Sequence, residues 1–204
     1  KEDYIFRSLA MPPQFGKVAK AYIAQDTQIS LDTNKRISNP NALNLYTLGY
    51  NYNRKLTPLS YAAKVNLATY LEQYRMLTDA INIKEASVIN FKLEFDITVK
   101  NGYSNDRALL SSINSLKSFF NTDNWQINEP INIGDITGLL YNINGIQTVN
   151  DLVFTNLFGE NSGYSKFKYN FEAATQNNTI YPSLDPSIFE LKYPNTDIIG
   201  RVTT

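Results

Sequence analysis

The sequence predicts an α+β fold, in which an antiparallel sheet is covered by helices on one face and is followed by an extended β-rich carboxy-terminal arm. The first observation is residues 88–100, where apolar and polar side chains alternate strictly. A period of two indicates a strand with one buried and one solvated face. A strand buried on both faces would be continuously apolar, so helices on one side only are favoured. The second observation is two amphipathic patterns, residues 58–76 and 105–120, which predict helices on either side of this strand in the sequence.

The alternating strand and its two neighbouring helices are expected to share one core. Thr57 and Pro58 suit the N-cap and the first position of the upstream helix, and Ser104 suits the N-cap of the downstream helix. We expect the apolar side chains of all three elements to be buried together. They are Phe91, Leu93, Phe95, Ile97 and Val99 in the strand, and Leu67, Leu71, Leu109, Ile113 and Leu116 in the helices.

The amino-terminal part predicts a helix followed by a hairpin. Residues 4–10 are expected to form a helix that two consecutive prolines end. Because residue 1 is not methionine and the helix begins at once, we expect the chain to be a piece of a longer protein. Residues 17–25 and 42–50 predict two strands joined by a long polar connection.

The second half predicts shorter elements. Residues 125–133 suit an extended segment or edge strand because they contain a proline, which cannot donate within a sheet. A short helix is expected at about 135–143, and residues 146–157 predict another strand.

The composition changes near Phe158, where prolines and glycines become frequent and helical periodicity ends. We therefore expect two parts, an α+β core domain at 1–157 and the β-rich arm at 158–204. In the arm, residues 164–171 and 188–193 resemble short strands. Since so short an arm buries little by itself, it must pack on the core domain or on another chain, and we expect another chain to hold most of it in place.

Charge and composition exclude several classes of function. The 19 basic and 19 acidic residues balance, and no basic run exists, so neither nucleic acid nor an anionic membrane surface is expected as a partner. The chain contains no histidine and no cysteine, which removes disulfides, the usual metal ligands and the usual general base. We expect no enzyme activity, no cofactor and no metal. A carboxylate pair or an oxygen-only calcium site stays open.

Four strings of residues occur in a familiar order. They are residues 11–22 (MPPQFGKVAKAY), 44–50 (NLYTLGY), 70–79 (YLEQYRMLTD) and 188–194 (IFELKYP). In this order they resemble the carboxy-terminal region of the baseplate wedge subunit of T-even-type contractile-tailed phages, within the baseplate J-like family. The large amino-terminal part of a full wedge subunit has no counterpart in this sequence.

The resemblance implies a structural protein without catalytic residues. Its implied partners are copies of itself, as a dimer or ring, and other baseplate wedge proteins. Its implied place is the tail baseplate of the virion, and the host cytoplasm during assembly. Function would then come from surface buried between subunits.

Contact residues are expected in the first string and in the arm. The candidates are Gln14, Phe15, Tyr169, Phe171, Phe189, Leu191 and Tyr193. For Gln14 and Phe15 a simple helix terminator is the competing interpretation. Two other classes of function stay open. One is a carbohydrate- or receptor-binding module of a tail or cell-surface protein, suggested by the asparagine and tyrosine content. The other is an enzyme that brings two acidic residues into one cleft.

Overall fold

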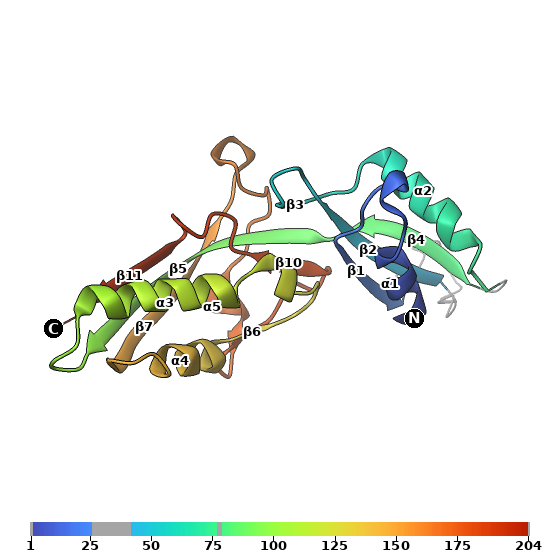
Figure 1. The fold of residues 1–204 in the computed structure, drawn as a ribbon. Helices are drawn as coiled ribbons and strands as arrows, with labels where there is room; N and C mark the ends of the chain where they lie inside the picture. Colours follow the sequence, from blue (N-terminus) through green and yellow to red (C-terminus); the bar gives the residue numbers. More distant parts are fainter. Residues whose placement is uncertain (1, 26–41, 77–78, 204) are drawn as a thin grey trace. The chain divides into compact units, whose positions relative to one another are not determined.

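The computed structural model of the chain describes residues 2–25, 42–76 and 79–203. The chain forms two compact units, Lys1–Ala86 and Ser87–Thr204. Figure 1 shows the helices and strands of both.

The first unit is a small mixed sheet with two helices. Its elements in order are α1 (Glu2–Leu9), a 3-10 turn (Pro13–Phe15), β1 (Lys20–Gln25), β2 (Ala42–Tyr50), β3 (Leu56–Thr57), α2 (Tyr61–Glu72) and β4 (Ala80–Glu85). Strand β2 pairs antiparallel with β1 and β3 and parallel with β4. Ile23, Leu45 and Ile83 stand side by side in register, and α1 and α2 pack against the sheet to complete the core.

The second unit is organised around one long strand. Its elements in order are β5 (Ser87–Val99), α3 (Asn105–Phe119), a 3-10 turn (Thr122–Asn124), β6 (Ile131–Asn132), α4 (Ile133–Tyr141), β7 (Ile146–Leu157), a second 3-10 turn (Glu160–Ser162), α5 (Phe171–Ala174), β8 (Thr175–Gln176), β9 (Thr179–Ile180), β10 (Ser187–Glu190) and β11 (Ile198–Val202). Strand β5 pairs antiparallel with β7 and parallel with β10 and β11. The short strands β6, β9 and β8 form a separate sheet.

Helices cover one face of the β5 sheet. Helix α3 packs on β11 and helix α4 packs on β7, and both lie on the same side of the sheet in Figure 1. The predicted register of β5 is confirmed, since Phe91, Leu93, Phe95 and Ile97 are buried while Lys92, Glu94, Asp96 and Thr98 are half-buried. Of the other predicted core residues in this unit, Leu116 is buried, and Val99, Leu109 and Ile113 are half-buried.

The α+β class is confirmed, as is the β-rich character of the carboxy-terminal region. Both main sheets also contain parallel pairs, which the sequence did not predict. Strands β4 and β11 were not predicted either. The predicted strand at 164–171 is wrong, because these residues form no strand and α5 begins at Phe171.

Helix α2 does not share a core with β5, so the prediction that Leu67 and Leu71 pack with Phe95 is wrong. Both leucines belong to the core of the first unit. The chain passes from one unit to the other between Ala86 and Ser87, where β5 begins. Neighbours in sequence therefore lie in different cores. The N-cap of α2 is Ser60 rather than Thr57, and the Ser60 hydroxyl accepts a hydrogen bond from the Ala63 N–H at 3.2 Å.

The boundary in the structure also differs from the predicted one between residues 157 and 158. Strands β10 and β11, both within the predicted arm, pair with β5. The arm is thus part of the second unit, and its strands find their sheet edge in the same chain. The prolines and glycines that suggested a separate arm lie mainly in loops between these short strands.

Candidate interaction surface

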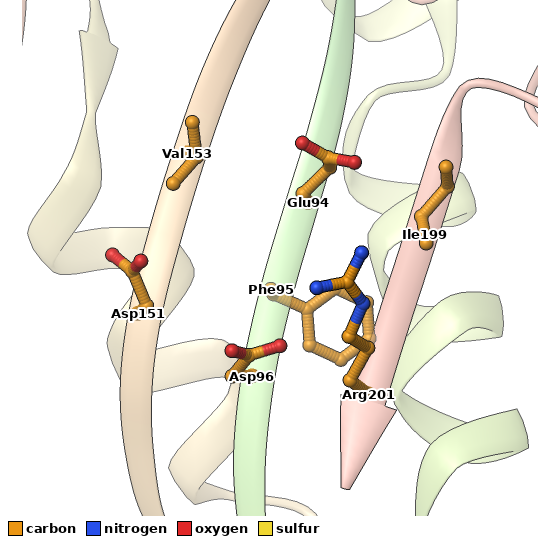
Figure 2. A pocket seen from close by; sticks show the side chains of 7 residues that line it. All are labelled: Glu94, Phe95, Asp96, Asp151, Val153, Ile199 and Arg201. Atoms are coloured by element: carbon orange, nitrogen blue, oxygen red, sulfur yellow. The ribbon is translucent and has the colours of Figure 1, made fainter.

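The face of the β5 sheet opposite α3 and α4 carries two cross-strand rows of side chains. One row is Val153 on β7, Glu94 on β5 and Ile199 on β11, and the other is Asp151, Asp96 and Arg201 on the same strands. Figure 2 shows these six side chains on one side of the three strands, with the Phe95 ring behind β5. We call this surface the open face.

The open face is charged and shallow. Glu94 forms an ion pair with Lys92, with Nζ and Oε1 separated by 3.0 Å. Asp96 lies directly across from Asp151, a like-charged pair that is unfavourable by itself, and Arg201 lies across from Asp96 on the other side. The hollow between the rows holds about 80 Å³. A pocket for a small-molecule substrate usually holds about 300–1,000 Å³, so this arrangement suits side-chain contact better than substrate binding.

The described residues contain no candidate metal site built from several acidic side chains. Within residues 2–25, 42–76 and 79–203, no group of three or more acidic side chains is placed to hold a metal ion. In the same residues, no helix is long and apolar enough to cross a membrane.

A buried polar network fixes residues 158–170 to the sheet. The side chain of Asn90, which is buried, donates to Glu190 Oε2 at 2.9 Å and accepts the Ser165 N–H at 2.8 Å. The Asn90 carbonyl accepts from Asn156 Nδ2 at 2.9 Å, and Asn156 Oδ1 accepts the Tyr169 N–H at 2.9 Å. Burial raises the pKa of Tyr169 to about 12. The alternation in β5 places Asn90 on the polar face, so its burial could not be predicted from the pattern.

Asp197 is a second buried polar centre. Its Oδ1 accepts from the Tyr164 hydroxyl at 2.8 Å, and its Oδ2 accepts the Tyr193 N–H at 2.8 Å. Burial, and then the hydrogen bond to the Asp197 carboxylate, raises the pKa of Tyr164 to about 12. The ring of Tyr164 also contacts that of Tyr193, with centroids 5.5 Å apart. These contacts hold the segment between β10 and β11 against the loop after β7.

The predicted contact residues divide between the interior and the surface. Phe171, Phe189 and Leu191 are buried, and the rings of Phe171 and Phe189 pack against Phe91 in the core of the second unit. These three side chains therefore lie in the interior of the second unit, and aromatic alternation in a strand is as typical of a core as of an interface.

The other four candidates are accessible. Tyr169 is half-buried, and Gln14, Phe15 and Tyr193 are exposed. Gln14 and Phe15 belong to the first unit, and both tyrosines belong to the second. Sequence reasoning missed several exposed apolar side chains, among them Phe6, Met76, Val153 and Leu184.

The comparisons with known proteins include a likeness to a solved structure. No protein-family model matches the sequence, and no curated protein matches it. The chain is similar over 99% of its length to a chain in the cryo-EM structure of the anti-feeding prophage baseplate, 6-fold symmetrised. The TM-score is 0.49, the sequence identity is 14%, and the match spans 37% of that longer chain.

Proposed function

We propose that this chain is a structural component of a contractile phage tail baseplate. In this role it joins the wedge and ring through contacts with copies of itself and with other wedge proteins, first in the host cytoplasm and then in the virion. The observation that carries the proposal is the order of the four sequence strings that resemble a baseplate wedge subunit. Residues 44–50 lie in β2 of the first unit and residues 188–194 include most of β10 in the second, so the resemblance extends over the framework of both units.

The surface supports a role in assembly. Large apolar side chains are exposed on both units, including Phe6 and Met76 in the first and Val153 and Leu184 in the second. Leu184 projects from the loop between β9 and β10, which hydrogen bonds from Ser183 to Ser187 and Asp185 stabilise. Because this loop is already ordered, its backbone loses little conformational entropy when a partner covers the apolar side chain that it presents.

The proposed role requires no catalytic residue. Asp96 and Asp151 do come from separate strands, as a carboxylate enzyme would require, but the hollow beside them is shallow. Binding energy in the proposed role comes from buried area and backbone pairing instead.

Incorporation into particles tests the proposal. Contractile tails from the source virus, purified on a density gradient, are expected to contain peptides of this chain in a fixed ratio to the other baseplate proteins. Loss of the gene is expected to give particles without complete baseplates. Normal infectious tails assembled without this chain would refute the proposal.

The competing function, a carbohydrate- or receptor-binding module, makes a different prediction. Such a module would bind a defined glycan or cell-surface receptor as the isolated chain. A glycan array therefore separates the two, and we expect no glycan to be bound above background.

A further inference from the structure

Strand β7 has a free backbone edge. Among the residues that the structure describes, β7 pairs with β5 and with no other strand. The Leu93 N–H donates to Asp197, and the Ile97 carbonyl accepts the Thr203 N–H, so these residues of β5 direct their backbone groups toward the β11 side. The intervening residue Glu94 must face β7.

The orientation of the backbone groups of β5 determines which N–H and C=O groups of β7 point away from the sheet. Glu94 is opposite Val153, so Val153 directs its N–H and C=O toward β5. Leu152 and Phe154 then direct theirs away from the sheet. A second observation agrees, because the Leu152 N–H donates to the side chain of Asp151 at 2.8 Å and not to β5.

The two ends of this edge bond to groups outside the sheet, whereas in its centre the bond from the Leu152 N–H to the neighbouring Asp151 is the one recorded among the described residues. The Val149 N–H donates to the Tyr141 hydroxyl at 3.5 Å, and the Asn156 side chain accepts the Tyr169 N–H. The irregularities in pairing fall before Asp151, so residues 151–157 are a regular strand. This stretch has no lysine, arginine or proline, and Asp151 is its one charged residue, so it has few of the side chains that usually prevent a free edge from pairing.

In residues 150–156, the side chains at equal distances before and after Val153 are chemically similar. Leu152 mirrors Phe154, Asp151 mirrors Thr155, and Asn150 mirrors Asn156. A twofold antiparallel pair of such strands places every residue opposite a compatible one.

We propose that β7 pairs with β7 of a second copy of this chain, antiparallel and centred on Val153. The N–H and C=O groups of Leu152 in one copy then bond those of Phe154 in the other, which is the pair whose backbone groups point outward. The Asp151 carboxylate releases the Leu152 N–H and accepts the Thr155 hydroxyl of the second copy.

Side chains favour the same register. Leu152 and Phe154 are half-buried on the helix-covered face, and pairing covers the remainder of each against the other. Val153 is 41% exposed on the open face and meets Val153 of the second copy. Because its backbone groups face inward, this is a non-hydrogen-bonded pair, with Cα atoms about 4.5 Å apart.

This separation permits a disulfide, and the chain has no cysteine of its own. The test compares three single-cysteine variants of the full 204-residue chain under mild oxidation at low micromolar concentration. Val153→Cys is expected to form a covalent dimer at least about tenfold faster than either control.

One control tests the register of the β7 pair, and the other tests which strand forms the contact. Thr155→Cys lies on the same strand and face, but its two Cα atoms would be roughly 14 Å apart across the twofold pair, too far for a disulfide. Ile199→Cys lies in the same cross-strand row as Val153 and is similarly exposed at 37%, but it is on β11. Equal rates for Val153→Cys and either control would overturn the proposal.

A measurement without substitution covers the case in which Val153→Cys does not fold. In the unmodified chain, the Phe154 amide should exchange with solvent more slowly at high protein concentration than at low concentration, while the Val149 amide should not change. No dependence of the Phe154 amide on concentration would also overturn the proposal.

The inference rests on the proposed function for its biological purpose, since it names a surface by which copies of a baseplate protein would join. The β7 pairing and the baseplate function can each be refuted without the other. A chain that enters baseplates without cross-linking through Val153→Cys refutes the β7 pairing alone. A chain that cross-links but is absent from purified tails refutes the baseplate function alone.

Discussion

Phe95 contributes to the core of the second unit from the centre of β5, where it is almost fully buried. Replacing it with alanine should lower the free energy of unfolding by about 3–5 kcal/mol, because the cavity cannot close completely. Urea unfolding measures the change. The matched control is Asp96→Ala, the next residue, which points to the open face and should change stability by about 0.5 kcal/mol or less. Equal effects of the two substitutions would mean that the assigned face of β5 is wrong.

Gly200 on β11 allows the sheet to approach its covering helix. A Cβ at this position would lie 2.4 Å from the Phe95 ring and 2.6 Å from Leu109 Cδ1. Gly200→Ala should therefore cost about 1–3 kcal/mol through overpacking. Gly138 in α4 is the control, because a Cβ there meets nothing within 4 Å. Gly138→Ala should raise stability by about 0.5–1 kcal/mol. A stabilising Gly200→Ala would contradict this packing.

Tyr164 should make stability depend on alkaline pH. Its pKa in the folded chain is about 12, above the ordinary value of 10.0, because of burial and the hydrogen bond to Asp197. The folded state thus holds this proton more tightly than the unfolded state, so the contribution is complete below pH 10 and is lost as the pH rises toward 12. Tyr164→Phe should flatten the decline in stability over this range and remove one late-ionising phenol from the absorbance titration at alkaline pH. Loss of a phenol that titrates near pH 10, with the late phase unchanged, would show that Tyr164 ionises normally.

The paired strands β5, β10 and β11 determine whether residues 158–204 are separable. A chain ending at residue 157 keeps β5 but loses β10, β11 and the buried Phe189 ring. We expect this truncated chain to lose the fold of the second unit, while the first unit, whose core lies within residues 1–86, stays folded. Hydrogen exchange should show unprotected amides throughout β5 and protected amides in β2. If the amides of β5 are protected from exchange in the truncated chain, residues 158–204 are an arm separate from the core, as the sequence predicted.

Periodicity in the sequence predicted individual elements better than their partners. The ranges 42–50 and 146–157 coincide with β2 and β7, and the burial register of β5 follows from its alternation. Strand β4 was missed because its pattern is short, with half-buried rather than buried apolar residues. Strand β11 is interrupted by Gly200, which weakens any strand pattern but is required by close packing.

The candidate surface was less predictable than the fold. Alternation identified Glu94 and Asp96 as solvated, but Asp151 and Arg201 join them only through the pairing of strands far apart in sequence. Whether an aromatic residue such as Phe189 lies in the core or on the surface likewise depends on which strand it pairs with. The free edge of β7 becomes visible only when the hydrogen bonds of β5 are assigned.

The whole chain comprises two compact α+β units, each with its own main sheet. Both present apolar side chains to the surroundings, and the four sequence strings that resemble a wedge subunit occur in both units. A protein of this kind would act through the surfaces it buries against other subunits. We therefore propose that the chain is located in the baseplate of a contractile tail.

Immunogold electron microscopy of contractile particles from the source virus tests that location most directly. An antibody against the isolated chain should label the baseplate end of the tail and leave the sheath and the head unlabelled. Particles that carry no label anywhere, while the same antibody detects the chain in infected cells and binds the folded protein, would contradict the proposed function.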